Sequence, residues 1–89
     1  MAQLSFSSAL QRHVACPPLE VEAGTVREAL EQAFRREPRL RGYLLDDQGA
    51  LRKHMAVFVN GAAVRDRRQL GDTVTSGSEI SVIQALSGG

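Results

Sequence analysis

The amino-acid sequence predicts an α+β fold in which one main helix lies across one face of a mixed four- to five-stranded sheet. Short segments with alternating apolar residues occur near both ends of the chain and around residue 57, which is the spacing of half-buried strands. Residues 26–34 instead repeat their apolar positions with the period of a helix. The chain has 89 residues, so these elements form one domain around one core.

Two strands are expected before the helix. Residues 3–10 begin with apolar side chains that alternate with serines, and residues 19–22 alternate in the same way. Between them lie a polar turn at residues 11–13 and the pair Pro17-Pro18, which excludes a helix because proline has no backbone donor. We therefore expect the two strands to pair as an antiparallel hairpin.

The helix has the clearest signal in the chain. Thr25 and Glu28 match a capping box, with a hydroxyl at the cap and a carboxylate three residues later. Pro38 predicts that the helix ends near Glu37. One helix face is wholly apolar and consists of Val26, Ala29, Leu30, Ala33 and Phe34.

The pattern of the segment after the helix is ambiguous. In residues 39–45, Leu40 and Leu44 are spaced as in a short helical turn, and Tyr43 is expected to cover one end of the core. Residues 46–49 (Asp-Asp-Gln-Gly) are a turn by composition.

Further strands complete the sheet. Residues 51–59 have apolar residues on both faces, which indicates an internal strand, and Asn60-Gly61 predicts a tight hairpin into a short strand at residues 63–65. The sequence then predicts a core-plugging Leu70, a turn at residues 75–78 and a final strand at residues 79–85. This order of elements is the β-grasp arrangement, with the first and last strands side by side in the middle.

Composition excludes several classes of function. Eleven basic and ten acidic residues leave a net charge of +1, which argues against a nucleic-acid binder with a dense basic face. The longest apolar run, residues 55–59, is far below the ~20 residues that span a bilayer, and the N-terminus has no secretory signal. One cysteine allows no internal disulfide, which fits the cytoplasm. In so short a chain, a carrier or binding module is favoured over an enzyme.

The pair Gly88-Gly89 at the end of the sequence has the strongest chemical implication. Two terminal glycines occur by chance in about 0.5% of chains, and here they follow a predicted strand. Glycine lets a tail thread a narrow channel because it has no Cβ, and residues 87–89 extend at most about 10 Å. A carboxylate presented in this way can be adenylated by ATP and then attacked by sulfide or a thiolate, which leaves a thiocarboxylate.

The sequence resembles the MoaD/ThiS-type sulfur carriers, which have the ubiquitin-like β-grasp fold, over essentially its whole length. Four segments carry the resemblance: 25–30 (Thr-Val-Arg-Glu-Ala-Leu), 57–61 (Val-Phe-Val-Asn-Gly), 77–83 (Gly-Ser-Glu-Ile-Ser-Val-Ile) and 85–89 (Ala-Leu-Ser-Gly-Gly). Residues 45–54 are similar to the longer, CysO-like branch, which includes carriers for cysteine biosynthesis. Gly77-Ser78 replaces the Gly-Asp of many members, and Leu86-Ser87 replaces their Val-Ala.

The resemblance implies a function and partners. Gly89 would be adenylated by a MoeB/ThiF-like activating enzyme (an adenylyltransferase) that uses ATP and Mg²⁺, and sulfide or a sulfur donor protein would convert it to a thiocarboxylate. A downstream synthase would accept the sulfur for a cofactor, cysteine or another metabolite. In some carriers, a metalloprotease trims residues after the diglycine. The carrier itself would bind no metal or cofactor and have no catalytic residue; its domain would span residues 1–86, followed by a tail at residues 87–89.

An apolar patch beside the tail is the expected docking surface. One face of the sheet would pack on the helix, and the opposite face would carry Phe58, Ile83 and Ala85. We hypothesise that Phe58, Ile83 and Leu86 contact the activating enzyme, with Ser87 beside them. The alternative is that these residues cover a second, minor core.

Other reactive residue types have simpler explanations. Cys16 stands before two prolines and fits a structural cysteine. His13 and His54 have no clustered cysteines or carboxylates, so no metal site is expected. Asp46-Asp47 fits hydrogen bonding in a turn. The arginines at positions 65, 67 and 68 fit a solvated loop or a guide for an acidic partner.

Two other functions are open. A ubiquitin-like modifier would join Gly89 to lysines of target proteins through the same activation chemistry. The chain has ten arginines but a single lysine, Lys53, which argues against chains of self-conjugates. The third possibility is a β-grasp interaction module with incidental terminal glycines, and the diglycine argues against it.

Overall fold

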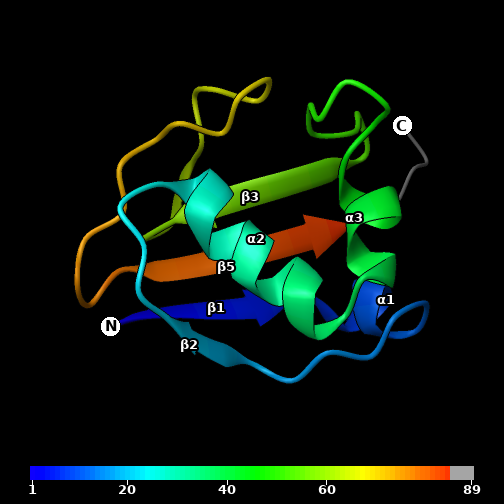
Figure 1. Ribbon diagram of the computed structural model, residues 1–89, viewed down its shortest axis with the longest axis horizontal. Coiled ribbons are helices and arrows are strands. Elements are labelled where there is room, and N and C mark those ends of the chain that lie inside the picture. The colour runs from blue at the N-terminus through cyan, green and yellow to red at the C-terminus, as the bar shows by residue number, and fades with distance from the viewer. Residues whose placement is uncertain (85–89) are drawn as a thin grey trace.

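The computed structural model describes residues 1–84 and contains, over that range, a five-stranded mixed sheet and three helices (Figure 1). In chain order these are β1 (Ala2–Phe6), α1 (Ser8–Gln11), β2 (Leu19–Val21), α2 (Val26–Arg36), α3 (Arg39–Leu44), β3 (Met55–Val59), β4 (Ala62–Ala63) and β5 (Glu79–Gln84). The strands lie in the order β2-β1-β5-β3-β4, and α2 crosses one face of the sheet (Figure 1). The predicted α+β β-grasp fold with one main helix is confirmed.

Strand β5 lies in the middle of the sheet. It pairs in parallel with β1, where Phe6 lies next to Val82, and antiparallel with β3, where Met55 lies next to Gln84. Strand β1 also pairs antiparallel with β2, as the predicted hairpin requires. The first and last strands in the chain therefore lie side by side, as predicted.

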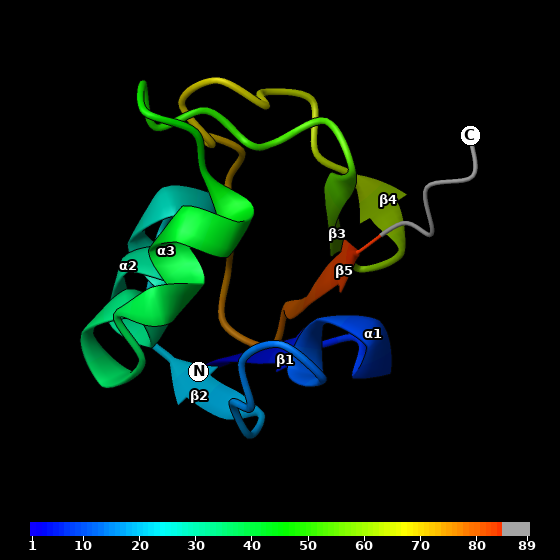
Figure 2. The ribbon, with the colours of Figure 1, turned by 90° about the vertical axis from the view of Figure 1, so that its right-hand side faces the viewer.

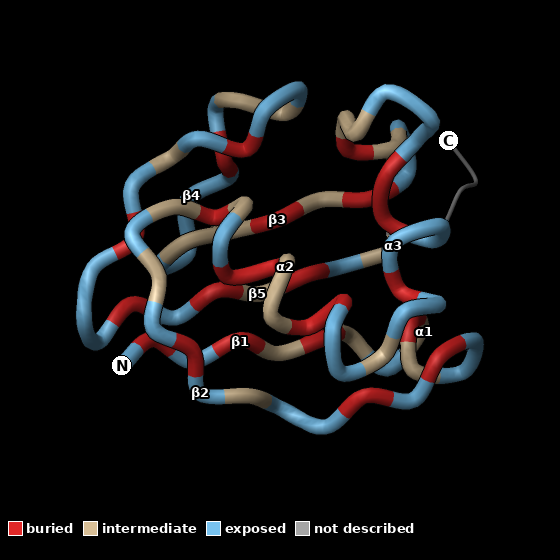
Figure 3. The backbone as a smooth tube through the Cα atoms, viewed as in Figure 1, coloured by how far each residue is buried: buried red, intermediate tan, exposed pale blue. Residues whose placement is uncertain are grey.

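The hydrophobic core lies between the sheet and the helices α2 and α3, which Figure 2 shows on one side of the strands. Buried residues alternate with more exposed ones along β1 and β5 (Figure 3), because successive side chains of a strand point to opposite faces. The apolar face of α2 is buried in full, as predicted. The sheet contributes to this core Leu4, Phe6, Val57, Ile80 and Val82, which are buried, and Val59, which is partly buried.

Helix α2 begins and ends where the sequence predicts. The Thr25 hydroxyl accepts a hydrogen bond from the Glu28 N–H (3.2 Å), and the Glu28 carboxylate accepts one from the Gly24 N–H (2.7 Å). These bonds satisfy backbone donors that a helix start leaves free. The helix ends at Arg36, and Glu37 is its C-cap.

The first predicted strand is wrong beyond Phe6. Ser7 instead caps α1, and its hydroxyl accepts a hydrogen bond from the Leu10 N–H (3.4 Å). Serine favours this position because its side chain bonds to the free donors of the first helical turn. The short helix also buries Leu10 completely.

The internal strand is shorter than predicted. Strand β3 begins at Met55 rather than at residue 51, because Leu51 bridges to Leu45 and the chain then turns. Its internal position is confirmed, since β5 and β4 lie on either side of it. The short strand predicted at residues 63–65 lies at residues 62–63.

The predicted hairpin turn and final strand are present. Asn60 and Gly61 have positive φ angles of 51° and 85°, as a tight turn between β3 and β4 requires. Of the final strand predicted at residues 79–85, residues 79–84 are confirmed, and Ala85 lies outside the described residues.

Residues 39–45, whose sequence pattern is ambiguous, form α3 over most of their length. This helix buries Leu40 and Leu44 completely, whereas Tyr43 is 39% exposed. The Tyr43 ring lies against His13, with 5.5 Å between the ring centroids. The Leu70 side chain is buried in the core although the residue lies in a loop, as predicted.

Candidate functional site

The sheet face opposite α2 carries a small apolar patch. Cross-strand pairing places Ala56 next to Ile83, and Phe58 between Ser81 and Ala63, so these side chains share one face. Ile83 is 37% exposed, and Phe58 and Ala56 are half-buried. We call the four apolar residues of this set, Ala56, Phe58, Ala63 and Ile83, the outer patch.

The structure brings together the predicted docking residues that it describes. Phe58 and Ile83 are diagonal neighbours on adjacent strands, for which a separation of about 7 Å is typical. The other predicted site residues, Leu86, Ser87, Gly88 and Gly89, lie outside the described residues. Their roles stay predictions, and the outer patch is the part of the site with a described geometry.

Ser7 fixes the end of β5, from which the chain continues toward its last residues. The Ser7 N–H donates to the Val82 carbonyl (2.9 Å), and the Ser7 hydroxyl accepts from the Gln84 N–H (3.2 Å). On the other side, Gln84 pairs with Met55. The sequence interpretation missed this role of Ser7. Its signal is a serine that directly follows an alternating strand and is well suited to a helix cap.

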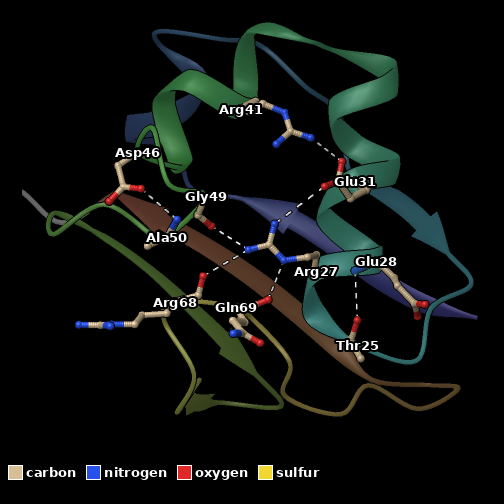
Figure 4. Close-up of polar contacts among 10 residues, drawn as sticks. All are labelled: Thr25, Arg27, Glu28, Glu31, Arg41, Asp46, Gly49, Ala50, Arg68 and Gln69. Atoms are coloured by element: carbon tan, nitrogen blue, oxygen red, sulfur yellow. Dashed lines mark hydrogen bonds and ion pairs between the residues drawn. The ribbon is translucent and has the colours of Figure 1, made fainter.

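Arg27 fastens the segment of residues 45–54, which we call the insert segment, to the body of the domain. Its guanidinium donates to the carbonyl oxygens of Gly49 (2.7 Å) and Gln69 (2.7 Å) (Figure 4). Glu31, one helical turn further along α2, lies 3.9 Å from the same guanidinium. A single charged side chain of α2 thus joins two loops that are distant in the sequence, because a guanidinium carries several donors.

Arg67 holds the end of the insert segment. Its guanidinium donates to the carbonyl oxygens of Arg52 (2.7 Å) and Met55 (2.8 Å). The interpretation of the arginine cluster as a solvated loop is therefore wrong for Arg67, although Arg65 and Arg68 are exposed. The reason is that the loop brings its middle arginine against backbone carbonyls, which a guanidinium satisfies well.

Two aspartates shape the loop that carries Leu70 into the core. The Asp66 carboxylate accepts backbone N–H donors from Gln69 (2.9 Å), Gly71 (3.1 Å) and Arg68 (3.2 Å). The Asp72 carboxylate accepts those of Arg65 and Asp66, both at 2.9 Å. These hydrogen bonds lower the pKa of both carboxyl groups, because they stabilise the charged form.

The remaining reactive residue types are explained by structure. Cys16 is buried in the core, and burial raises the pKa of its thiol. The Asp46 carboxylate accepts the N–H groups of Gln48 (2.9 Å) and Ala50 (3.0 Å), as the turn interpretation predicts. Residues 1–84 contain no group of three or more His, Cys, Asp or Glu side chains that could hold a metal ion.

The arrangement suits contact with another protein near the end of β5. A hydrogen-bonded strand in the middle of the sheet leads to the last residues, and the exposed Ile83 of the outer patch lies one residue before its end. An exposed apolar patch on a small domain is typical of a protein contact. Within residues 1–84, no helix has the length and apolar character needed to cross a membrane.

Comparison with known proteins gives a family match. A model of the ThiS family matches residues 12–89. No curated protein sequence matches the chain.

Several solved structures share the fold. SAMP1 from Haloferax volcanii is 25% identical, with a TM-score of 0.82 over 99% of this chain and 98% of that chain. CysO in the BexX/CysO complex from Amycolatopsis orientalis is 23% identical, with a TM-score of 0.83 over 100% of both chains. CysO from Mycobacterium tuberculosis is 17% identical, with a TM-score of 0.80 over 97% of this chain and 100% of that chain.

Proposed function

Because the chain belongs to the ThiS family, as its sequence motifs predicted, we propose that it is a sulfur carrier that is modified at the carboxylate of Gly89. The observation that carries the proposal is the family match over residues 12–89, which includes the diglycine. The proposed reaction needs no catalytic residue in this chain. Its role is that of a protein co-substrate.

The proposed chemistry has two steps. A carboxylate oxygen of Gly89 attacks the α-phosphate of ATP in a MoeB/ThiF-like enzyme, which releases pyrophosphate and forms an acyl adenylate. Sulfide, or sulfur delivered by a donor protein, then attacks the acyl carbon and releases AMP, which leaves the thiocarboxylate. Mg²⁺ and ATP belong to the site of the partner enzyme. The thiocarboxylate then gives its sulfur to a downstream synthase that makes a cofactor, cysteine or another sulfur-containing metabolite.

We further propose that the outer patch, together with Leu86 and Ser87, docks on the activating enzyme. Phe58 and Ile83 lie on the same sheet face near the end of β5, so a partner that binds this face is in position to receive the residues that follow. The BexX/CysO complex supports a protein partner for a chain of this fold.

A ubiquitin-like modifier is the second candidate. It is favoured by the likeness to SAMP1, which is a small archaeal modifier protein. Activation of Gly89 would be the same, but the acyl group would pass to a lysine amine of a target protein instead of to sulfur.

Intact mass spectrometry tests the sulfur-carrier proposal directly. The full chain is incubated with ATP, Mg²⁺, sulfide and each candidate MoeB/ThiF-like enzyme. We expect a mass gain equal to the difference between one sulfur and one oxygen atom, confined to the C-terminal peptide. A variant that lacks Gly89 and a variant with one alanine added after Gly89 serve as matched controls, and neither should gain mass.

The outcomes separate the candidate functions. Transfer of the chain to lysines of other proteins, without a thiocarboxylate, would support the modifier. No mass change with any activating enzyme, for a chain whose circular dichroism shows a folded domain, would contradict both activation proposals and favour an interaction module.

A further inference from the structure

Primary amines are almost absent from this chain. Ten of its eleven basic side chains are arginines, and Lys53 is the single lysine. The guanidinium of arginine stays protonated and has no free lone pair with which to attack an acyl group. An amine can form an amide with an activated carboxylate. The chain therefore combines a carboxylate proposed to be activated with a single side-chain amine.

The fold places the backbone of Lys53 near the residue that pairs with the last described residue of β5. Gln84, the last described residue of β5, pairs with Met55, and Lys53 lies two residues before Met55. Lys53 is exposed, and within residues 1–84 its amine has no hydrogen bond or ion pair. Five residues extend at most about 17 Å, so Gly89 can reach the side chain of a residue this close to Gln84.

The backbone on both sides of Lys53 is held in place. Arg67 bonds to the carbonyl oxygen of Arg52 just before Lys53, and to that of Met55 just after it. A fixed backbone lowers the entropy cost of bringing an amine to an acyl carbon. Lys53 also lines a surface depression that it shares with Asp46 and His54.

The other primary amine lies at the opposite end of β5. The N-terminal amine of Met1 donates to the Ser76 hydroxyl (3.1 Å), and the Met1 carbonyl accepts from the Gly77 N–H (3.1 Å). Both contacts lie just before β5 begins at Glu79. The length of β5 therefore separates this amine from Gln84, whereas Lys53 is two residues from Met55, the pairing partner of Gln84.

We propose that Lys53 captures the activated C-terminus of its own chain when sulfide does not intercept it, an inference that rests on the proposed activation of Gly89. The uncharged Nζ attacks the acyl carbon of the Gly89 adenylate, the C–N bond forms, the bond to the phosphate oxygen breaks, and AMP leaves. Nζ gives up one proton to solvent. The product is an amide that closes the chain between Gly89 and Lys53, and nothing is oxidised or reduced.

Closure removes the carrier from its cycle, because the product has no free carboxylate to activate. Arginine at the other basic positions retains the positive charge without adding competing amines. Lys53 is then the one position where self-acylation is fast enough to compete with sulfur transfer.

A chemically made thioester tests closure without any activating enzyme. The full chain is prepared as a Gly89 thioester by thiol cleavage of an intein fusion, and its intact mass is followed over time. We expect a product lighter than the free acid by one water molecule, with a peptide cross-link between Lys53 and Gly89. Its rate should rise with pH, because only the uncharged amine attacks, and should not depend on protein concentration. The thioester should disappear at least about tenfold faster than in the Lys53→Arg variant, because an intramolecular amine has a high effective concentration.

A second variant keeps the number of lysines constant. Lys53→Arg combined with Arg35→Lys moves the amine to the exposed surface of α2, beside Glu22 and Gly24, and should close no faster than Lys53→Arg. Equal rates of thioester loss in wild type and Lys53→Arg, or a covalent dimer as the amide product, would overturn the proposal. Because the thioester replaces adenylation, failure here is distinct from failure of the sulfur-carrier proposal.

Discussion

At the scale of single residues, the loop of residues 65–72 shows how side chains can determine a backbone that has no regular structure. Leu70 is completely buried although its φ angle is 56°, a left-handed conformation that a branched side chain rarely adopts. The hydrogen bonds that the Asp66 and Asp72 carboxylates accept from the loop hold this conformation. Burial of the Leu70 side chain offsets the backbone strain.

Shortening Leu70 should therefore lower stability strongly. We expect Leu70→Ala to reduce the free energy of unfolding by about 2–5 kcal/mol, because it removes buried methyl groups and leaves a cavity. Leu70→Met, which keeps the volume, should cost less than about 1.5 kcal/mol. Urea unfolding measures both. If both variants lost the same free energy of unfolding, burial of the Leu70 side chain would not be the source of the stability.

The lowered pKa of the Asp66 carboxyl leads us to expect that stability depends on pH. Its pKa is lowered in the fold by the N–H donors of Gln69, Gly71 and Arg68, relative to about 4 in an unfolded chain. A depressed pKa contributes stability that is complete above the unfolded value and is lost as the pH falls through the folded value. We expect Asp66→Asn to be less stable than wild type at neutral pH, and the difference to shrink as the pH falls below the unfolded value of about 4. A difference in urea midpoint that is constant from neutral to acidic pH would contradict this.

At the scale of elements, α2 both covers the sheet and organises the loops beside it. Its apolar face is buried in the core, while Arg27 on its first turns reaches the carbonyls of Gly49 and Gln69 (Figure 4). The start of the helix is itself fixed by Thr25 and Glu28. A change at the helix start should therefore also loosen the backbone of the insert segment.

Removing the helix cap gives a measurable effect. We expect Thr25→Ala to lower the free energy of unfolding by about 1 kcal/mol, because the Glu28 N–H loses its acceptor. Thr25→Ser, which keeps the hydroxyl, serves as the matched control and should remain within about 0.5 kcal/mol of wild type. Hydrogen exchange should also become faster at Gly49 in Thr25→Ala if α2 positions the insert segment. Unchanged hydrogen exchange at Gly49 would show that the helix start does not affect the conformation of the insert segment.

At the scale of the whole molecule, the fold directs one sheet face toward the core and places the outer patch on the opposite face. The helices α2 and α3 lie on the core side of the strands (Figure 2), and cross-strand pairing sets the outer patch on the other face. The outer patch includes Ile83 because β5, the last described strand, lies in the middle of the sheet.

A charge in the outer patch should weaken docking without unfolding the domain. We expect Phe58→Asp to raise the KM of the activating enzyme for the carrier at least about tenfold, as for a central aromatic contact of an interface. Tyr43→Asp is the matched control, because Tyr43 is an exposed aromatic on α3, and its KM should not change. Urea unfolding of both variants checks that the domain is intact. A wild-type adenylation rate for folded Phe58→Asp would refute docking through the outer patch.

The sequence by itself determined those features that arise from local periodicity and local hydrogen bonding. The apolar face of α2, its Thr25 cap, the Asn60-Gly61 turn and the alternation in β1 and β5 depend on residues within a few positions of one another. The family match then confirmed what the helix start, the strand segments and the diglycine predicted together.

Only the tertiary structure decided the features that depend on distant residues. The bonds that Ser7 makes to Gln84, and those made by Arg27 and Arg67, arise where a side chain meets a backbone group outside its own element. A guanidinium on a helix and one in a loop have the same local pattern whether they bind water or backbone, so the sequence gives no sign of the difference. The position of Lys53 beside the end of β5 is of the same kind, because the pairing of Met55 with Gln84 joins residues separated by most of the second half of the chain.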